Sequence, residues 1–593
     1  MAALRTHLGA LKLHGMLLPR ADIFQGEYLP PSEDRLAWLT GFTGSAGFCI
    51  VLQRRAALFV DGRYTAQAKA EVDPRVVQPV ALAALAPEQW LEKRARRGQR
   101  IGYDPTLFTE RGLAKFRGAA ERAGLALVPL ATDPFDAVWD QRPLPPATPV
   151  QPHEAVFAGL GAAEKLRQVE EALDDARCDA LVVSECPSVN WLFNIRAGDV
   201  PHLPILRAFA LIERGRPARL YADPARFTPE ARSSLERVAE IVAPTSGPAD
   251  GRTEIVADLE RLTKAGRRVR LDAETAPVLF SDVITRAGSQ PSVGADPITL
   301  LKAQKNPVEL AGARAAHLRD GAAMVRFLAG LETALASGPV TEIDATIALE
   351  KERIATGALV DISFPSIAGA GPNAALPHYR VTEQTNRAIT PGLFLIDSGG
   401  QYRDGTTDIT RTLAVGTPTR AMKDAYTRVL KGMIAISRCV FPKGTSGAQI
   451  DALARQFLWN AGKDFDHGTG HGVGSFLSVH EGPQRISKFG AAALLPGMIL
   501  SNEPGYYREG HFGIRIENLV AVQENPIRGG ERTMLGFETL TWCPIDTRPV
   551  IRSMLTRDER NWLNHYHAET EARLAPLLEG AALAYLRKAC TPL

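Results

Sequence analysis

Four acidic residues lie on two segments that each have the pattern of a β-hairpin. Asp397 ends an apolar run and Asp408 follows the turn-like sequence YRDG, and the two acids are placed symmetrically about a point within that turn. Glu503 and Glu517 are placed in the same way about Gly510. Directly opposed residues of a hairpin share one face of the sheet, with β-carbons about 4.5–5.5 Å apart. Two carboxylates at that distance repel each other unless a cation lies between them, so each hairpin predicts part of a metal site.

The glycine-rich segment between the hairpins, DHGTGHGVGSFLSVHEGP, carries His467, His471 and His480. The spacing of His467 and His471 would suit a helical zinc pair, but the two glycines and the threonine between them argue against a helix. In the outgoing strand of the second hairpin, Arg515 and Glu517 take the face opposite to the neighbouring isoleucines. We therefore expect Arg515 to point the same way as Glu517.

The charge of the acidic set indicates how many ions it could hold. Two aspartates and two glutamates would balance two divalent cations, and one neutral imidazole would complete the set. Because the ligands are mostly carboxylate oxygen with one nitrogen, they favour manganese first and then zinc, cobalt or iron. The sequence therefore predicts a dinuclear metal site.

Two changes in the sequence pattern mark domain boundaries in the chain. The segment 139–153 contains five prolines and reads as an extended linker, so a domain ends near residue 145. Further on, Asn306 is suited to cap a helix that has Pro307 at its first position and Glu309 in its first turn. A new domain is therefore expected to start near residue 305.

The N-terminal half alternates strand-like runs with helical stretches, and a Trp-Leu pair recurs at Trp38 and at Trp191. This pattern predicts two similar α/β domains, at 1–145 and 153–304. Residues 305–593 are expected to form one larger α+β unit. Its predicted helices lie near 307–336, 341–357, 418–439 and 446–462.

Composition excludes several classes of protein. The chain has 69 Lys and Arg against 66 Asp and Glu, with no long basic block, so we expect no nucleic-acid partner. No apolar run approaches the roughly 18 residues of a membrane span, and the N-terminus lacks the pattern of a secretory signal. Six scattered cysteines without a CxxC pair indicate free thiols in a reducing compartment. We expect a cytoplasmic protein without a membrane partner.

The motifs that hold the acids resemble those of the pita-bread metallopeptidases. They are DSGGQYRDGTTDITRT, GTGHGVGSF, NEPGYY and GIRIEN, and the metal ligands that the resemblance implies are Asp397, Asp408, His471, Glu503 and Glu517. Within that superfamily the chain resembles the long, three-domain Xaa-Pro aminopeptidases. This likeness extends to FTGSAG and DGRY in the first domain, NWLFNIRAGDV in the second, and PIDTRPV near the end.

The resemblance implies a fold and an activity. The fold would be two creatinase-like α/β domains followed by a pita-bread catalytic domain at 305–593, whose segment from about 535 to 593 supports a homodimer. The activity would be hydrolysis of the N-terminal Xaa-Pro bond, with peptides that carry proline at the second position as partners. The nucleophile would be a water bridging two divalent ions, which are expected to be Mn²⁺, with Zn²⁺ or Co²⁺ as alternatives.

The resemblance also implies roles for individual side chains. Glu503 would act as general base or acid, and His378 would support the oxyanion or the leaving group. His480 and His467 would contact the substrate, and Arg515 would orient a ligand carboxylate or the neighbouring loop. Arg63, in DGRY, would approach the active site from its own or a neighbouring subunit.

Two other functions remain open from the sequence. A prolidase shares the ligands but cleaves only Xaa-Pro dipeptides, and a non-catalytic peptide-binding protein could use the same fold. The complete set of five ligand residues argues against the binding protein.

Overall fold

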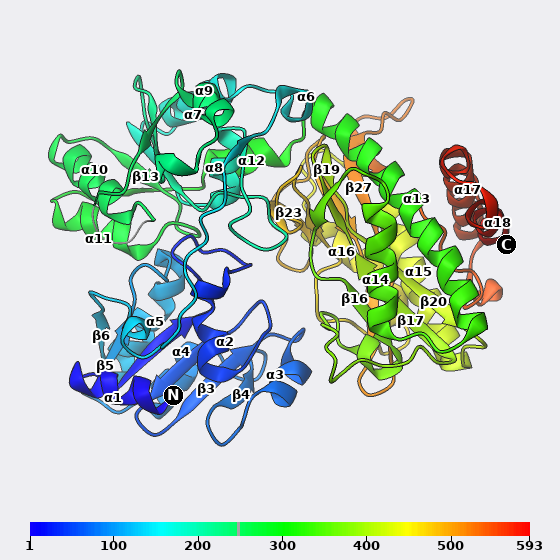
Figure 1. The fold of residues 1–593 in the computed structure, drawn as a ribbon, viewed down its shortest axis with the longest axis horizontal. Coiled ribbons are helices and arrows are strands. Elements are labelled where there is room, and N and C mark those ends of the chain that lie inside the picture. The colour runs from blue at the N-terminus through cyan, green and yellow to red at the C-terminus, as the bar shows by residue number, and fades with distance from the viewer. Residues whose placement is uncertain (246–249) are drawn as a thin grey trace. The chain divides into compact units, whose positions relative to one another are not determined.

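The computed structural model describes residues 1–245 and 250–593, which divide into two compact units (Figure 1). Unit 1 contains Met1–Ala155 and Leu160–Thr299, and unit 2 contains Val156–Gly159 and Leu300–Leu593. The division of the chain at residues 145 and 304 into three domains stays a prediction. Each unit combines helices and sheets, as the α/β and α+β fold class requires.

Unit 1 contains two six-stranded sheets with the same topology. The first sheet has the order β4(Gln78–Ala81), β3(Ala56–Val60), β2(Phe48–Leu52), β1(Gly15–Pro19), β5(Arg100–Tyr103), β6(Ala126–Pro129). The second has the order β12(Ala239–Val242), β11(Ala218–Tyr221), β10(Phe209–Glu213), β8(Ala180–Val183), β13(Val269–Leu271), β14(Ser292–Val293). In each sheet the third strand of this order pairs antiparallel with the second and with the fourth. All other neighbouring strands pair parallel.

The recurring Trp-Leu pair occupies the same place in both halves of unit 1. Trp38 lies on α2(Arg35–Thr40), between β1 and β2, and Trp191 lies on α8(Cys186–Leu192), between β8 and β10. This common position confirms that the two halves have the same kind of fold. The longer helices of the unit are α1(Ala2–Ala10), α5(Glu110–Ala123), α7(Ala162–Asp175), α10(Arg252–Lys264) and α11(Val278–Arg286).

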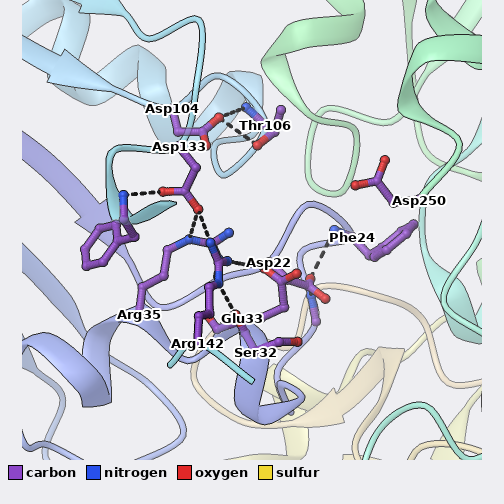
Figure 2. A network of polar contacts seen from close by, with 12 residues as sticks. Asp22, Phe24, Ser32, Glu33, Arg35, Asp104, Thr106, Asp133, Arg142 and Asp250 are labelled. Carbon is purple, nitrogen blue, oxygen red and sulfur yellow. Dashed lines mark hydrogen bonds and ion pairs between the residues drawn. The ribbon is translucent and has the colours of Figure 1, made fainter. Parts of the chain in front are cut away.

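Buried ion pairs join the two halves within unit 1. Figure 2 shows the part of this network in the first half, around Arg35, Glu33 and Asp133. Arg35 lies 2.7 Å from Glu33 and 2.8 Å from Asp133. Arg207, from the second half, lies 3.0 Å from Asp22 and 3.3 Å from Glu33. Burial would raise the pKa of Glu33, but the charges of Arg35 and Arg207 hold that pKa below its usual value. Glu33 therefore stays ionised at neutral pH and links the two halves.

Unit 2 contains the helices that the sequence predicts. They are α13(Pro307–Ser337), α14(Glu342–Ile354), α15(Arg420–Ser437) and α16(Gly447–Trp459). The side chain of Asn306 caps α13 by accepting hydrogen bonds from the N–H groups of Val308 and Glu309. The Glu309 carboxylate in turn accepts a hydrogen bond from the N–H of Asn306. Two further helices, α17(Arg557–Leu574) and α18(Gly580–Ala589), follow near the C-terminus. The predicted helix boundaries are thus confirmed to within a few residues.

Four sheets of unit 2 carry the acidic hairpins and the histidines. The largest has the order β21(Phe441–Pro442), β28(Met534–Thr539), β27(Asn518–Glu524), β24(Ile499–Asn502), β22(Gly470–Gly472), β23(Glu481–Ile486). The three-stranded sheets are β16(Ile367–Ala370), β17(Gly392–Ser398), β20(Ile409–Val415) and β15(Leu359–Ile362), β18(Gly400–Tyr402), β19(Gly405–Thr406). The last is the pair β25(Gly505–Arg508), β26(Phe512–Arg515).

Two further predictions concern the whole chain. All six cysteines are free thiols, as their spacing indicates. Among the described residues, no helix combines the length and the apolar character needed to cross a membrane.

Candidate metal centre

The first acidic hairpin forms, but its register differs from the predicted one. Asp397, in β17, pairs with Thr410 of β20 rather than with Asp408. The reason is the turn: Tyr402 pairs with Gly405, so the tight turn is centred on Arg403 and Asp404 and the register shifts by two residues. Because side chains alternate with a period of two, Asp408 keeps the face of Thr410 and becomes the diagonal neighbour of Asp397. The expectation of direct opposition is therefore wrong, while the shared face follows from the observed register.

The second acidic hairpin has the predicted register. Asn502 pairs with Asn518 on one side of the two glutamates, and Gly505 pairs with Arg515 on the other. Glu503 and Glu517 therefore lie at the junction between the long β24–β27 pair and the short β25–β26 pair. Ile514 and Ile516 are buried in one hydrophobic cluster with helix α15. Arg515 and Glu517 take the other face, as expected.

His471 lies on the short strand β22, which is adjacent to β24 in the same sheet. The segment around it is not helical, so the structure excludes a helical zinc pair with His467. Nδ1 of His471 lies 2.9 Å from the carbonyl oxygen of Gly472, to which it donates. Its Nε2 atom lies 3.5 Å from Asp408 Oδ2 and 3.4 Å from Glu503 Oε1. The ring thus directs its lone pair toward the acids, as a metal-binding imidazole does.

Side chains of three segments converge at this point. One ligand atom from each of Asp408, His471 and Glu517 lies within 4.8 Å of the others. Glu517 is fixed by Thr410, whose hydroxyl donates to Glu517 Oε2 at 2.7 Å. The Oδ1 atoms of Asp397 and Asp408 are buried and have no hydrogen-bond partner among the described residues. Buried carboxylate oxygens without a donor are costly, and a cation would satisfy both of them.

The pKa values show how strongly the cluster requires positive charge. Burial raises the pKa of Asp397 to about 7, since the neighbouring Arg515 only partly offsets burial and the charge of Asp408. Burial and the charges of the other acids also raise the pKa of Glu517 well above its usual value. Burial would lower the pKa of His471, but its contacts with Asp408 and Glu503 raise that pKa to about 9. The residues present therefore fit divalent cations, which would supply this charge in place of protons.

Arg515 connects Asp397 to the loop that carries His378. Its Nη2 atom donates to Asp397 Oδ2 at 2.5 Å and to the carbonyl oxygen of Pro377 at 3.2 Å. Its Nε atom donates to the hydroxyl of Thr410 at 3.2 Å. Arg515 is therefore in contact with both features that the sequence offered as alternatives, a ligand carboxylate and the neighbouring loop.

Tyr507 is a residue of the site that the sequence analysis missed. Its hydroxyl accepts a hydrogen bond from Arg515 Nη1 at 2.5 Å and lies 2.8 Å from Nε2 of His467. Because Nδ1 of His467 lies 2.7 Å from the carbonyl oxygen of Gly468 and donates to it, Nε2 is the acceptor and Tyr507 is the donor. Its sequence signal is its place at the end of the motif NEPGYY, and in the structure it lies on the strand that pairs with the strand of Arg515.

The remaining predicted residues lie in different surroundings. The ring of His480 packs edge-on against that of His471, with centroids 4.4 Å apart. Nδ1 of His467 lies 3.9 Å from Glu503 Oε2. His378 is half-buried beside Pro377. Arg63 belongs to unit 1, where it lies 2.7 Å from Asp61 and over the ring of Tyr64.

Comparison with protein families covers almost the whole chain. Residues 311–524 match the model of metallopeptidase family M24, and residues 533–593 match the C-terminal region of that peptidase. Residues 1–137 and 141–309 each match a creatinase/prolidase N-terminal domain.

Individual relatives match over nearly the same length. The chain is 39% identical over 591 residues to a probable Xaa-Pro aminopeptidase P of Aspergillus fumigatus, covering 96% of this chain and 88% of the relative. It is 37% identical over 602 residues to aminopeptidase P2 of Arabidopsis thaliana, covering 95% and 84%. A crystal structure of X-prolyl aminopeptidase from Caenorhabditis elegans superposes with a TM-score of 0.93 at 34% identity, covering 98% of this chain and 95% of that one. On this likeness the chain belongs to the metallopeptidase family M24, in the group that carries creatinase/prolidase N-terminal domains.

Proposed function

We propose that this chain is an aminopeptidase that hydrolyses the bond before proline when proline is the second residue of a peptide. The relatives named Xaa-Pro aminopeptidase P, and the C. elegans enzyme described as cytosolic with a di-nuclear active site, support this substrate class. The observation that carries the proposal is the convergence of Asp408, His471 and Glu517 at a point where the buried Oδ1 atoms of Asp397 and Asp408 receive no hydrogen bond from the described part of the chain. The complete set of five ligand residues argues against a non-catalytic binding protein.

Five side chains would hold two divalent cations, and they are Asp397, Asp408, His471, Glu503 and Glu517. When bound, the cations would polarise the scissile carbonyl and make water a nucleophile near neutral pH. Carboxylate oxygen with one imidazole nitrogen favours Mn²⁺, with Zn²⁺ and Co²⁺ as alternatives. His471 would contribute Nε2, because its Nδ1 hydrogen is held by the carbonyl oxygen of Gly472.

Glu503 would move the proton of the reaction. Its Oε1 atom accepts a hydrogen bond from Ser501 at 3.1 Å. A carboxylate oxygen that no cation holds could accept a proton from water and return it to the leaving group. Arg515 holds the carboxylate of Asp397, and Tyr507 holds the ring of His467. Arg515 Nε and His467 Nδ1 each lie 3.9 Å from Glu503 Oε2.

His378 and His480 would orient the substrate. Arg515 fixes the carbonyl of Pro377, so the backbone that carries His378 is anchored to the ligand set. His480 is held against the ring of His471. The amide nitrogen before proline is tertiary and carries no N–H, so the site must bind this bond without that donor. We assign oxyanion or leaving-group support to His378 and substrate contact to His480, His467 and Arg515.

Three further parts of the proposal rest on resemblance. Arg63 would contact the substrate from its own or a neighbouring subunit. The segment from about 535 to 593 would support a homodimer, which sedimentation would test. The cytoplasm would be the site of action, in line with the free cysteines and with the cytosolic relative.

The test of function is a comparison of substrates after removal and return of metal. The protein is stripped with a chelator, and Mn²⁺, Zn²⁺ or Co²⁺ is added back singly. We expect an Xaa-Pro-Yaa tripeptide to be cleaved after Xaa, most rapidly with Mn²⁺, and the chelated protein to be inactive. Cleavage of Xaa-Pro dipeptides alone would instead identify a prolidase, and no turnover with any metal would identify a binding protein.

A further inference from the structure

Arg411 is a fully buried cation close to the candidate metal ligands. It lies in β20 with 1% of its surface exposed, three residues after Asp408. Among the described residues, no carboxylate forms an ion pair with it. Its guanidinium instead donates to uncharged oxygens, which are those of Thr410 O, Glu517 O, Asn518 Oδ1, Cys543 O, Pro544 O and Tyr566 Oη.

These acceptors belong to three separate parts of unit 2. Nη1 donates to the carbonyl oxygens of Thr410 at 2.9 Å and of Glu517 at 2.5 Å. Nε donates to the carbonyl oxygen of Pro544 at 3.0 Å, and Nη2 donates to that of Cys543 at 2.8 Å. The guanidinium therefore joins three segments. They are strand β20 of the first acidic hairpin, the main chain at Glu517 in the second hairpin, and the C-terminal region at 533–593.

The contact with Glu517 holds a ligand by its main chain. Glu517 N–H donates to the carbonyl oxygen of Thr410 at 3.2 Å, and the Thr410 hydroxyl donates to Glu517 Oε2 at 2.7 Å. Arg411 adds the third link, between the carbonyl oxygens of these same two residues. Glu517 is thereby fixed relative to β20, the strand that begins directly after Asp408.

Tyr566 anchors the other end of this arrangement. Its hydroxyl lies 2.9 Å from Arg411 Nη2 and accepts from Cys543 N–H at 3.2 Å. Its ring stacks with those of Trp542 and Trp562, with centroids 5.6 Å and 5.4 Å away and interplanar angles of 17° and 7°. These two stacked neighbours restrict the ring and therefore the position of its hydroxyl. Helix α17 thus reaches the metal ligands through one buried side chain.

A buried guanidinium without a counter-ion is stable only when its donors are satisfied, because desolvation costs several kcal/mol. The acceptors in the C-terminal region therefore restrain the Arg411 guanidinium, and this guanidinium in turn holds the main chain of Glu517. Groups that orient metal ligands in this way typically change metal affinity or activity about 10- to 100-fold when they are altered.

We propose that Arg411 and Tyr566 are positioning residues of the metal centre, through which the C-terminal region at 533–593 sets the place of Glu517 beside Asp408. The proposal rests on the proposed function, since it concerns the same site. It adds that the C-terminal region, which supplies none of the five ligands, is required for their geometry.

The experiment measures metal binding separately from turnover. Arg411→Lys keeps the charge and loses the fork of donors, and Tyr566→Phe removes one hydroxyl while keeping the stacked ring. Tyr221→Phe is the matched control, because Tyr221 is also fully buried and donates its hydroxyl to Asp258 at 2.7 Å, but in unit 1. Each metal-free protein is titrated with Mn²⁺ by calorimetry, and the visible absorption spectrum of its Co²⁺ form is recorded.

We expect Arg411→Lys to bind Mn²⁺ about tenfold or more weakly and Tyr566→Phe about three- to tenfold more weakly, both with altered Co²⁺ spectra. Tyr221→Phe is expected to keep the affinity and spectrum of the unchanged protein while losing thermal stability. The proposal is overturned if Tyr566→Phe, and Arg411→Lys where it folds, keep the Mn²⁺ affinity and the Co²⁺ spectrum of the unchanged protein. It is also overturned if Tyr221→Phe loses as much Mn²⁺ affinity as these variants. Should Arg411→Lys fail to fold, Tyr566→Phe decides alone. Failure of the unchanged protein to bind Mn²⁺ would instead contradict the proposed function.

Discussion

Nη2 of Arg515 lies 2.5 Å from Oδ2 of Asp397 and donates a hydrogen bond to it. The outgoing strand of the second acidic hairpin thus binds a carboxylate of the first hairpin. Both side chains are buried, with 3% and 9% of their surfaces exposed. The other oxygen of Asp397, Oδ1, has no hydrogen bond among the described residues. One carboxylate thus divides its two oxygens between a protein cation and the position proposed for a metal.

Replacing Arg515 should separate its role from simple stability. In Arg515→Gln the carboxylate of Asp397 and the carbonyl of Pro377 lose their shared donor. We expect kcat on an Xaa-Pro-Yaa peptide to fall about 10- to 100-fold at saturating Mn²⁺. The control is Arg314→Gln, which removes an exposed arginine paired with Glu538 in the same unit and should leave kcat unchanged. Equal kcat in the two variants would contradict the role given to Arg515.

Tyr507 and its neighbour Tyr506 offer a second matched pair. Tyr507→Phe removes the hydroxyl that joins Arg515 to His467, whereas the ring stays in place. We expect kcat to fall about tenfold, since both partners lose a hydrogen bond near the acids. Tyr506→Phe should retain the activity of the unchanged protein. Steady-state kinetics of both variants would reject the link if Tyr507→Phe were equally active.

The pH dependence of stability should contain a contribution from His567. Burial lowers the pKa of this histidine to about 4, and its Nε2 atom accepts the N–H of Ile545 at 3.1 Å. Since the unfolded state takes up a proton near pH 6.5 and the folded state only near pH 4, stability falls as pH decreases between these values, by up to roughly 3 kcal/mol.

Thermal unfolding at a series of pH values tests this sign. His567→Gln keeps an acceptor for Ile545 without a titrating group, so its midpoint should fall less steeply between pH 6.5 and 4. His565→Gln, an exposed position on the same helix, should follow the unchanged protein. Parallel curves for all three proteins would exclude the contribution of His567.

A buried ion pair ties the first hairpin to helix α13. Arg353 is fully buried and contacts Asp320 at 2.8 Å, and the hydroxyl of Tyr402 donates to the same carboxylate at 2.7 Å. Asp320→Ala would leave Arg353 without its counter-ion, which typically costs about 3–5 kcal/mol. Glu569→Ala, which breaks an exposed pair with Arg573, should cost less than about 1 kcal/mol. Urea unfolding of both variants checks the difference, and similar midpoints would contradict it.

Several elements could be predicted because local rules determine them. Asn306, Pro307 and Glu309 mark the start of α13, and the structure has the corresponding capping contacts. The register of the second hairpin follows from the symmetry of its glutamates about Gly510. The recurring Trp-Leu pair indicated two similar halves, which the matching sheet orders confirm.

Other features depend on long-range contacts or on the position of a turn, and local sequence patterns do not determine these. Within YRDG two turn centres are possible, and the one that pairs Tyr402 with Gly405 shifts Asp408 by two positions. Tyr507 reaches His467 only because the fold brings the segment before β22 close to β25. Arg411 looks like any charged residue of an alternating strand, and its burial depends on carbonyl groups more than a hundred residues away.

The central claim is that five side chains hold two cations, and metal content tests it most directly. The unchanged protein, Asp408→Ala and Asp404→Ala are dialysed against Mn²⁺ and then against buffer, and metal per chain is measured by mass spectrometry. Asp404 lies in the same hairpin turn and pairs with Arg319, so it is the control. We predict about two ions per chain for the unchanged protein and Asp404→Ala, and at most about one, without peptidase activity, for Asp408→Ala. Two ions and full activity in Asp408→Ala would contradict the account.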